Sequence, residues 1–489
     1  MANQYVKDYT AKLYQQPTGE KVVLNLLWGD CVRPVANEPE ANGRIKVRAR
    51  GWSGYVKKSA LGDKPLLELY FIDVGQGDGV LIVTPDRKHI LIDGGYNRSD
   101  QPGGKNAADF VDWKFHEDYG MNNIVIDDMI VSHPDADHYG GLWDLINPDE
   151  QEELDTPTAN ISVKHFYHPG LSWFKSANDS RSLGPKTQNH FTLLLGDKQN
   201  MATMLEPNQT GHVVQGEWGK FIKRVVEKAE TCQRLSHLSG HLPGYEADKP
   251  VKIKVLGPIE STVNGNPALK SFGGESINTN GHSVTLRLDY GRTRIMLTGD
   301  LNSKAQQAIL ASLAGKEHEL ACDVAKSCHH GSDDCSFAFL QKINAAVTVI
   351  SSGDSEGHGH PRPTIVGASA ISGYQQLDGD TLLSPMVYST EIARSYKLGT
   401  PLKLILKGTP PQTVDKQTKV DVNFLERTSG GLNNKVKTKP FWPRKIVSGI
   451  IYGLVNVRTD GDTILSATLS EQDATWDYKV IKSRFPLVG

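Results

Sequence analysis

Short apolar runs separated by polar or glycine-rich turns recur along most of the chain. Three runs rich in leucine, isoleucine and valine occupy 66–74, 79–84 and 89–93, and the turns GQGDG and PDRK lie between them. Short apolar runs bounded by turn residues are typical of β-strands. The same pattern predicts further strands within 125–133, 251–258, 283–290, 292–300, 324–332 and 346–354.

Segments with a helical pattern lie between these strands, at 302–315 and 337–343. Strands alternating with helices predict an α/β sandwich with its site along one edge. Between about 150 and 250 we expect an insertion with long polar helices, at 187–206 and 217–235, that forms a lid or substrate wall. Its segment FYHPGLSWFKS (166–176) carries aromatic side chains that we expect to be exposed.

Residues 20–61 show a different pattern, in which short stretches of alternating apolar and polar residues predict the hairpins of a small β-barrel. The sequence GWSGYV at 51–56 resembles a late strand of bacterial SH3-like domains. From Arg44 to Lys58 there are six basic residues, no acidic residue, and the aromatics Trp52 and Tyr55. This segment is either a nucleic-acid or cell-envelope patch, or a solvated strand face with its aromatics in the barrel core.

These patterns divide the chain into three parts. We expect an SH3-like domain at 1–62, a main domain at 63–400, and a β-rich segment at 401–489 that packs on the main domain or completes it. Within the last part, 435–445 combines basic and aromatic residues (Lys435, Lys437, Lys439, Phe441, Trp442, Arg444 and Lys445). Such a segment could hold a single nucleic-acid strand by charge and stacking.

Composition narrows the class of protein further. With 489 residues and 38% hydrophobic residues, the chain can bury a sizeable core. Lys plus Arg total 54 and Asp plus Glu total 56, so no overall field attracts a polyanion. Five cysteines without CxxC spacing, no signal-peptide pattern and no membrane-spanning apolar run predict a cytoplasmic protein that does not enter a membrane.

The stretch SHPDADHYGG at 132–141 concentrates the polar residues that bind metals. It follows a predicted strand, so His133, Asp135, Asp137 and His138 fall within one tight loop. Alternating residues of such a loop can converge while adjacent ones diverge, which suits two neighbouring ions better than one. The glycine pair Gly140-Gly141 would let a helix begin close to the site. The alternative is a polar surface loop.

Later strand ends supply further candidate ligands. Asp300 ends MLTGDL, His329 and His330 lie in SCHHGS, and His358 and His360 lie in GHGHPRP. A single histidine is usually a packed or surface residue, but several sets of His and Asp at strand ends indicate a metal site.

These motifs identify a resemblance to the metallo-β-lactamase superfamily, whose His-x-His-x-Asp-His motif appears as HPDADH at 133–138. The likeness is closer to the metallo-hydrolase domain of ComEC-type competence proteins and covers about 300 of the 489 residues. It extends through FIDVGQGDG, ILIDGG, SHPDADHYGG, the segments ending in MLTGDL and SCHHGS, and GHPRP. The resemblance implies an αββα sandwich with metals at one edge between the sheets. Asp135 replaces a histidine of the superfamily motif, and His168 is either the missing later histidine or a packed residue.

On this basis we assign two divalent ions, Zn²⁺ or Mn²⁺. His133 and Asp135 would hold the first, Asp137 and His138 the second, and Asp300 would bridge them. His329 or His330 would complete the second site, and His360 would be a further ligand or a donor to the substrate oxyanion. Asp137 and His360 are therefore the predicted catalytic residues. Asp73, Asp78 and Asp93 are predicted to be structural residues or acceptors for ligating histidines.

The leading prediction is a phosphodiesterase acting on nucleic acid, because a two-ion site with oxygen ligands suits attack at phosphate. One alternative is a phosphodiesterase for a small substrate, such as a cyclic nucleotide or a phosphocholine-like ester, with the 150–250 segment closing over it. Another is a docking subunit with structural metals, whose SH3-like and C-terminal parts bind a partner protein.

Overall fold

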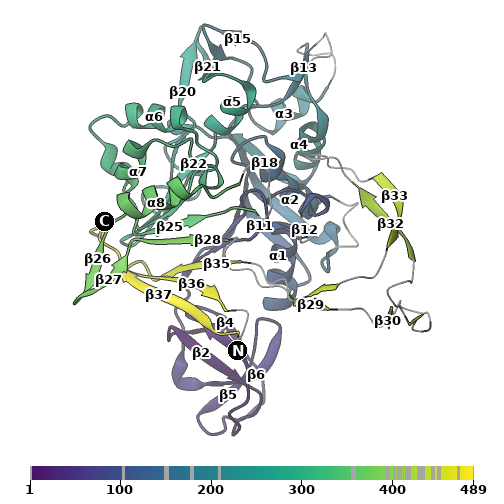
Figure 1. Ribbon diagram of the computed structural model, residues 1–489, viewed down its shortest axis with the longest axis vertical. Helices are drawn as coiled ribbons and strands as arrows, with labels where there is room; N and C mark the ends of the chain where they lie inside the picture. Colours follow the sequence, from purple (N-terminus) through teal and green to yellow (C-terminus); the bar gives the residue numbers. More distant parts are fainter. Residues whose placement is uncertain are drawn as a thin grey trace.

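Two β-sheets packed face to face form the centre of the molecule (Figure 1). The computed structural model describes residues 3–101, 105–147, 154–176, 181–206, 211–353, 359–390, 453–470 and 474–487; between 391 and 452 it describes residue 410 and six short strands. Among these residues no helix has the length and apolar character needed to cross a membrane.

The first sheet has nine strands. Their spatial order is β18 (Ala229–Arg234), β12 (Ile161–His168), β11 (Ile124–Ile130), β10 (His89–Ile92), β9 (Val80–Val83), β8 (Leu67–Phe71), β35 (Val455–Thr459), β36 (Thr463–Leu469) and β37 (Trp476–Lys482). β10, β11, β12 and β18 are parallel, and the remaining pairs are antiparallel. Strands from the end of the chain therefore extend a sheet that begins at Leu67.

The second sheet has six strands. Their order is β19 (Val251–Gly257), β22 (Thr285–Tyr290), β23 (Thr293–Leu297), β24 (Val324–Lys326), β25 (Val347–Ile350) and β28 (Met386–Ser389). The last four are parallel to one another, whereas β19 and β22 are antiparallel to their neighbours. All nine strands predicted between 66 and 354 are present.

Helices cover both outer faces. Buried apolar side chains of α1 (Ala107–Trp113), α2 (Ala136–Ile146), α3 (Lys198–Met204) and α4 (Gly216–Lys228) share a core with the first sheet. Those of α6 (Ser303–Ser312) and α7 (Phe337–Ile343) pack on the second, with α8 (Pro363–Ser372) beside α7. The layers are helix, sheet, sheet, helix, and the mixed α/β class predicted from the sequence is confirmed (Figure 1).

Residues before Leu66 form a separate seven-stranded sheet, which lies below the sandwich in Figure 1. Its order is β3 (Val22–Leu27), β2 (Thr10–Tyr14), β6 (Trp52–Lys57), β5 (Arg44–Ala49), β4 (Cys31–Pro34), β1 (Gln4–Val6) and β7 (Leu61–Gly62). It encloses a small apolar core of its own, with Leu13, Leu26 and Val47 fully buried. We refer to residues 3–62 as the N-terminal unit.

The remaining strands form small sheets. One contains β14 (Arg181–Ser182), β13 (Phe174–Ser176) and β17 (His212–Val214), and another β15 (Lys186–Thr187), β16 (His190–Phe191), β21 (Asn266–Lys270) and β20 (Glu260–Val263). Two-stranded pairs are β26 (Gln376–Asp378) with β27 (Thr381–Ser384), β29 (Lys397–Gly399) with β34 (Ile446–Ser448), β30 (Lys403–Leu404) with β31 (Gln412–Thr413), and β32 (Val420–Glu426) with β33 (Lys435–Phe441). The basic and aromatic side chains of 435–445 lie outside the described residues.

The expected helical insertion at 150–250 is wrong in two respects. β12 and β18 lie within it and continue the first sheet in parallel, so the segment is not separate from the sandwich. Of the helix expected at 187–206, only Lys198–Met204 is helical, because Asp197 caps a helix that cannot extend back through the strand at His190. The helix expected at 217–235 matches α4 but gives way to β18 at Ala229.

The aromatic segment 166–176 is also not exposed as expected. Phe166, Tyr167, Trp173 and Phe174 are all less than 9% exposed. The polar residues between them, His168 and Ser172, are buried as well, and the His168 ring stacks on that of Phe166.

A buried arginine on β35 connects the N-terminal unit to the sandwich. The Nη1 atom of Arg458 lies 2.8 Å from Oδ1 of Asp30 and donates to the carbonyl oxygen of Trp28 at 2.6 Å. The side chains of Arg458 and Asp30 are 2% and 4% exposed. Burial disfavours the charge of Asp30, but Arg458, Arg50 and Lys114 together with the Leu27 backbone N–H outweigh it, and the pKa of Asp30 falls below its usual range.

We expect Arg458→Met to lower the free energy of unfolding by about 3–5 kcal/mol, because it leaves the buried Asp30 carboxylate without its cation. Chemical denaturation would measure the loss. The control is Lys479→Met, which removes a cation from an exposed position on β37. The double variant Arg458→Met with Asp30→Asn should recover part of the stability, and no recovery would contradict the charge-pair explanation.

Candidate metal centre

Strand ends from both sheets meet at one edge of the sandwich. β10 leads into Asp93, β11 into His133, β23 into Asp300, and β24 into the pair His329 and His330. β10 and β11 are parallel, as are β23 and β24, so each pair brings its carboxyl-terminal loops to the same edge. The loop ends collected there are those that the sequence marks as rich in His and Asp.

The segment SHPDADHYGG forms the turn between β11 and α2. Asp135 takes the N-cap position of α2, and Asp137 and His138 lie in its first turn. A Cβ atom on Gly141 would lie 2.0 Å from the carbonyl oxygen of Gly94, so only glycine lets the helix approach this closely. The close approach predicted for the glycine pair is confirmed.

Four of the predicted residues bring their ligand atoms together. These atoms, from Asp137, His138, Asp300 and His330, all lie within 4.8 Å of one another. Nε2 of His330 is 2.9 Å from Oδ2 of Asp300 and 3.5 Å from Oδ2 of Asp137. Nε2 of His138 is 3.3 Å from the same Asp300 oxygen. We call this group the four-residue cluster.

The opposite ring nitrogens of these histidines contact further carboxylates. Nδ1 of His138 lies 2.8 Å from Oδ2 of Asp93, whose other oxygen accepts from the Ser132 backbone N–H at 2.7 Å. Nδ1 of His330 lies 3.3 Å from Oδ1 of Asp78. Such contacts orient a ligating imidazole and direct its Nε2 toward the metal. They agree with the acceptor role predicted for Asp78 and Asp93.

The sequence reading missed Lys326, the last residue of β24. Its side chain is 2% exposed and its ammonium group forms an ion pair with Asp78. It also donates to the carbonyl oxygen of Gly299 at 2.9 Å and lies 3.8 Å from Oδ1 of Asp300. A lysine at the end of an otherwise apolar strand, three residues before His329, was the available signal.

Beside the four-residue cluster lie His133 and Asp135, the other candidate ligands of the loop at 132–141, which we call the metal loop. Nε2 of His133 is 3.5 Å from Oδ2 of Asp135, and Thr279 donates to that oxygen at 2.8 Å. Thr279 lies in α5 (Glu275–Gly281), so this short helix supports Asp135. Nε2 of His329 lies 4.0 Å from Oδ2 of Asp300. His330 is thus the member of the histidine pair that joins the four-residue cluster, and His329 lies on its rim.

His168 lies at the end of β12 and is fully engaged by the backbone. Its Nε2 lies 2.9 Å from the carbonyl oxygen of Gly196, and its Nδ1 accepts from the Gly170 N–H at 3.1 Å. Burial lowers the pKa of His168 to about 4. Of the two readings of this residue, the packed histidine is the one that the contacts support.

His360 lines the same cavity as the cluster without joining it. Its ring centroid is 5.7 Å from that of His329, and the two rings meet nearly edge to face. His358 lies outside the described residues.

Electrostatic interactions within the four-residue cluster favour the charged forms of its histidines and carboxylates. Burial opposes the charge on each group, but neighbouring carboxylates raise the pKa values of His138 and His330 well above the usual range. Burial also disfavours the charge of the Asp300 carboxylate, but His330 and His138 hold the pKa of Asp300 well below its usual range. The imidazoles and carboxylates of the cluster therefore stabilise one another's charged forms.

The donor set fits a divalent cation. Among the described residues, the Nε2 atoms of His133, His138 and His330 are buried without a hydrogen bond, and those of His138 and His330 face the Asp300 carboxylate. Imidazole nitrogens and carboxylate oxygens together suit Zn²⁺ or Mn²⁺. A cation at this point would satisfy ligand atoms that otherwise face one another.

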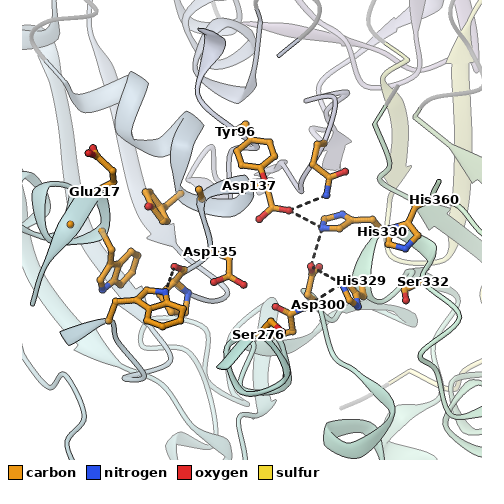
Figure 2. A pocket seen from close by; sticks show the side chains of 18 of the residues that line it. Tyr96, Asp135, Asp137, Glu217, Ser276, Asp300, His329, His330, Ser332 and His360 are labelled. Carbon is orange, nitrogen blue, oxygen red and sulfur yellow. Dashed lines mark hydrogen bonds and ion pairs between the residues drawn. The ribbon is translucent and has the colours of Figure 1, made fainter. Parts of the chain in front are cut away.

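A cavity of about 950 Å³ opens onto these residues. Figure 2 shows Asp137 and Asp300 approaching His330 from two sides, with His329 and His360 nearby and Asp135 and Glu217 progressively farther from the histidines. Aromatic residues, among them Tyr139, Trp173 and Trp218, line the wall on the Glu217 side. The cavity therefore extends well beyond the metal ligands on one side.

Three of the six basic residues at 44–58 form ion pairs within the N-terminal unit. Arg44 pairs with Glu20, Lys46 with Glu38 and Lys58 with Glu40. The guanidinium of Arg50 instead lies over the rings of Trp113 and Trp476 of the sandwich.

Of the two aromatics of this segment, Trp52 contradicts the alternative that places them in the barrel core. Trp52 is 60% exposed, so it does not lie in the core of the unit. The expectation that this aromatic fills the barrel core is wrong, because its strand position faces solvent.

We expect Asp93→Asn to weaken divalent metal binding about 10- to 100-fold, because His138 loses the carboxylate that holds its ring. Isothermal titration with Zn²⁺ or Mn²⁺ would measure the change. Asp248→Asn, which alters an exposed carboxylate, is the control. Unchanged affinity in Asp93→Asn would show that the contact is unrelated to metal binding.

Comparisons with known proteins give limited matches. A segment of 107 residues is 29% identical to competence protein ComA of Neisseria gonorrhoeae, covering 22% of this chain and 15% of that protein. A solved metallo-beta-lactamase from Cronobacter sakazakii, a HARLDQ motif mutant, matches 70% of this chain and 94% of its own at 12% identity, with a TM-score of 0.24. No family model matches the chain.

Proposed function

We propose that this protein is a metal-dependent hydrolase of metallo-β-lactamase type that cleaves phosphodiester bonds in nucleic acid. The observation that carries the proposal is the convergence of Asp137, His138, Asp300 and His330 within 4.8 Å beside a large cavity. Two imidazoles and two carboxylates at one point, three of them buried, form a donor set typical of hydrolytic metal sites.

The four-residue cluster would hold one Zn²⁺ or Mn²⁺ ion, and His133 with Asp135 would contribute to a second that shares Asp300. When bound, such ions supply a water of lowered pKa and draw negative charge from a phosphoryl oxygen. His138 and His330 are held in orientation by Asp93 and Asp78, so their Nε2 atoms need no rearrangement.

Two further residues would support the reaction, His360 at the substrate and Gln76 through its hydrogen bond to Asp137. His360 is placed at the cavity wall beside His329, where its ring can donate a proton to an oxyanion or a leaving group. Gln76 donates to Oδ2 of Asp137 at 3.0 Å and holds that carboxylate in place.

A nucleic-acid substrate is supported by three observations. The sequence motifs resemble those of ComEC-type hydrolase domains, and the curated relative is named a competence protein. The cavity extends from His360 past Asp135 to Glu217, which leaves room for more than a single small ester (Figure 2). The small-substrate enzyme is the alternative, and a partner protein bound by the N-terminal unit stays a prediction.

We expect purified protein supplied with Mn²⁺ or Zn²⁺ to cleave single-stranded DNA, double-stranded DNA or RNA. Asp137→Asn and Asp300→Asn should each lower this activity at least about 100-fold, since each removes a carboxylate ligand. Asp378→Asn, at an exposed position in β26, should retain full activity. Cleavage of bis-(p-nitrophenyl) phosphate alone would favour the small-substrate enzyme.

The dependence of KM on salt concentration distinguishes a nucleic-acid substrate from a small phosphodiester. If the protein grips several phosphates of a strand, KM for a polymer should rise steeply between 50 and 200 mM salt, because counterions compete for those contacts. The same titration with bis-(p-nitrophenyl) phosphate should change KM little. A flat response with the polymer would contradict extended contact with a nucleic-acid backbone.

A further inference from the structure

A single arginine stands on the aromatic wall of the cavity. The Cζ atom of Arg181 lies 3.6 Å from the ring centroid of Trp173, and both residues line the cavity that holds the metal ligands. Within the described part of the chain, its guanidinium forms no hydrogen bond or ion pair with another residue. Stacking occupies the face of a guanidinium and leaves its in-plane N–H donors directed outward.

The Trp173 ring beneath Arg181, which we call the platform, is connected to the metal loop by a hydrogen bond. Trp173 is 6% exposed, and its indole N–H donates to the carbonyl oxygen of Pro134 at 3.1 Å. Pro134 lies between His133 and Asp135 in the chain. The stack and this hydrogen bond connect the guanidinium of Arg181 to the segment that carries His133 and Asp135.

Arg181 lies on the side of the cavity away from His360. It belongs to β14, which pairs with β13, and β13 pairs with β17 directly before Gln215 and Glu217. The Gln215 N–H donates to the carbonyl oxygen of Trp173 at 3.2 Å, which joins the arginine platform to that wall. Figure 2 shows Glu217 on the far side of Asp135 from the histidines. A group bound by Arg181 would thus be separate from the group at the metal site.

We propose that Arg181 binds a phosphate of the substrate strand other than the phosphate being cleaved. This inference rests on the proposed function and names the part of the substrate that the aromatic wall recognises. An unpaired, pre-positioned guanidinium suits two-pronged binding of a phosphate, and the neighbouring rings offer surfaces for a base. The chemistry that this subsite selects is an anionic group one or more units along a nucleic-acid chain.

The test compares substrates that differ in the additional phosphates. Bis-(p-nitrophenyl) phosphate and a thymidine dinucleotide contain one phosphodiester each, whereas a ten-residue oligothymidylate contains phosphates on either side. Arg181→Gln should lower kcat/KM for the oligomer about 10-fold or more and leave the two small substrates within about twofold. Arg181→Lys should recover part of the loss, since it keeps the charge without the planar donors.

Lys223→Gln is the matched control, because it removes one positive charge from an exposed position on α4, the helix whose first turn lines the cavity. It should leave all three substrates unchanged. An equal loss on every substrate in Arg181→Gln, or no loss on any, would overturn the subsite. Dinucleotides that carry a 5′ or 3′ terminal phosphate test whether Arg181 binds a terminal phosphate instead of a phosphate within the strand. If Arg181→Gln lowers kcat/KM for these dinucleotides and not for the oligomer, the assignment to phosphates within a strand is overturned.

A binding measurement keeps the subsite separate from the proposed activity. In an Asp137→Asn background with Mn²⁺, fluorescence anisotropy would report the affinity for labelled oligothymidylate. Arg181→Gln should weaken binding about 10-fold and reduce the salt slope by about 1. If the wild-type protein cleaves no phosphodiester, the proposed function fails. The anisotropy comparison with and without Arg181 then decides by itself whether Arg181 binds a phosphate of the strand. Equal affinities with and without Arg181 would overturn the subsite.

Discussion

Buried negative charge at one edge of the sandwich is the constraint on which the rest of the structure depends. Asp78, Asp93 and Asp300 are each no more than 2% exposed, and an ionised carboxylate without a cation is costly in such surroundings. Lys326 offsets Asp78, and His138 and His330 face the others. The remaining ligand atoms converge on one point, where a divalent cation would complete the balance of charge.

The fold satisfies this constraint by gathering strand ends that are far apart in the sequence. β10 and β11 belong to the first sheet, and β23 and β24 to the second, so the cluster exists only where the two sheets meet. Gly141 lets α2 begin against Gly94, and α5 supports Asp135 through Thr279. Ligands, supporting acceptors and a buried lysine are thereby fixed on rigid elements, which favours a preorganised hydrolytic site.

The end of the chain contributes to the same assembly. β35 pairs with β8, and the Gly453 N–H before it donates to Oδ2 of Asp73, in the loop that leads to Asp78. Arg458 on that strand also joins the N-terminal unit through Asp30. The segments on either side of residues 63–400 therefore contact the sheet that carries the metal loop.

The sequence by itself determined nine strands of the two central sheets, the mixed α/β class and the candidate ligands, because these buried strands read as apolar runs with His and Asp residues directly after them. It could not separate His329 from His330, since that choice depends on which ring turns toward Asp300. Lys326 and the platform of Trp173 and Arg181 escaped it, as their roles arise from contacts between segments distant in sequence. The membership of β12 and β18 in the first sheet was likewise decided by tertiary pairing, because at least half of the side chains of each strand are polar and gave no sign of a buried partner.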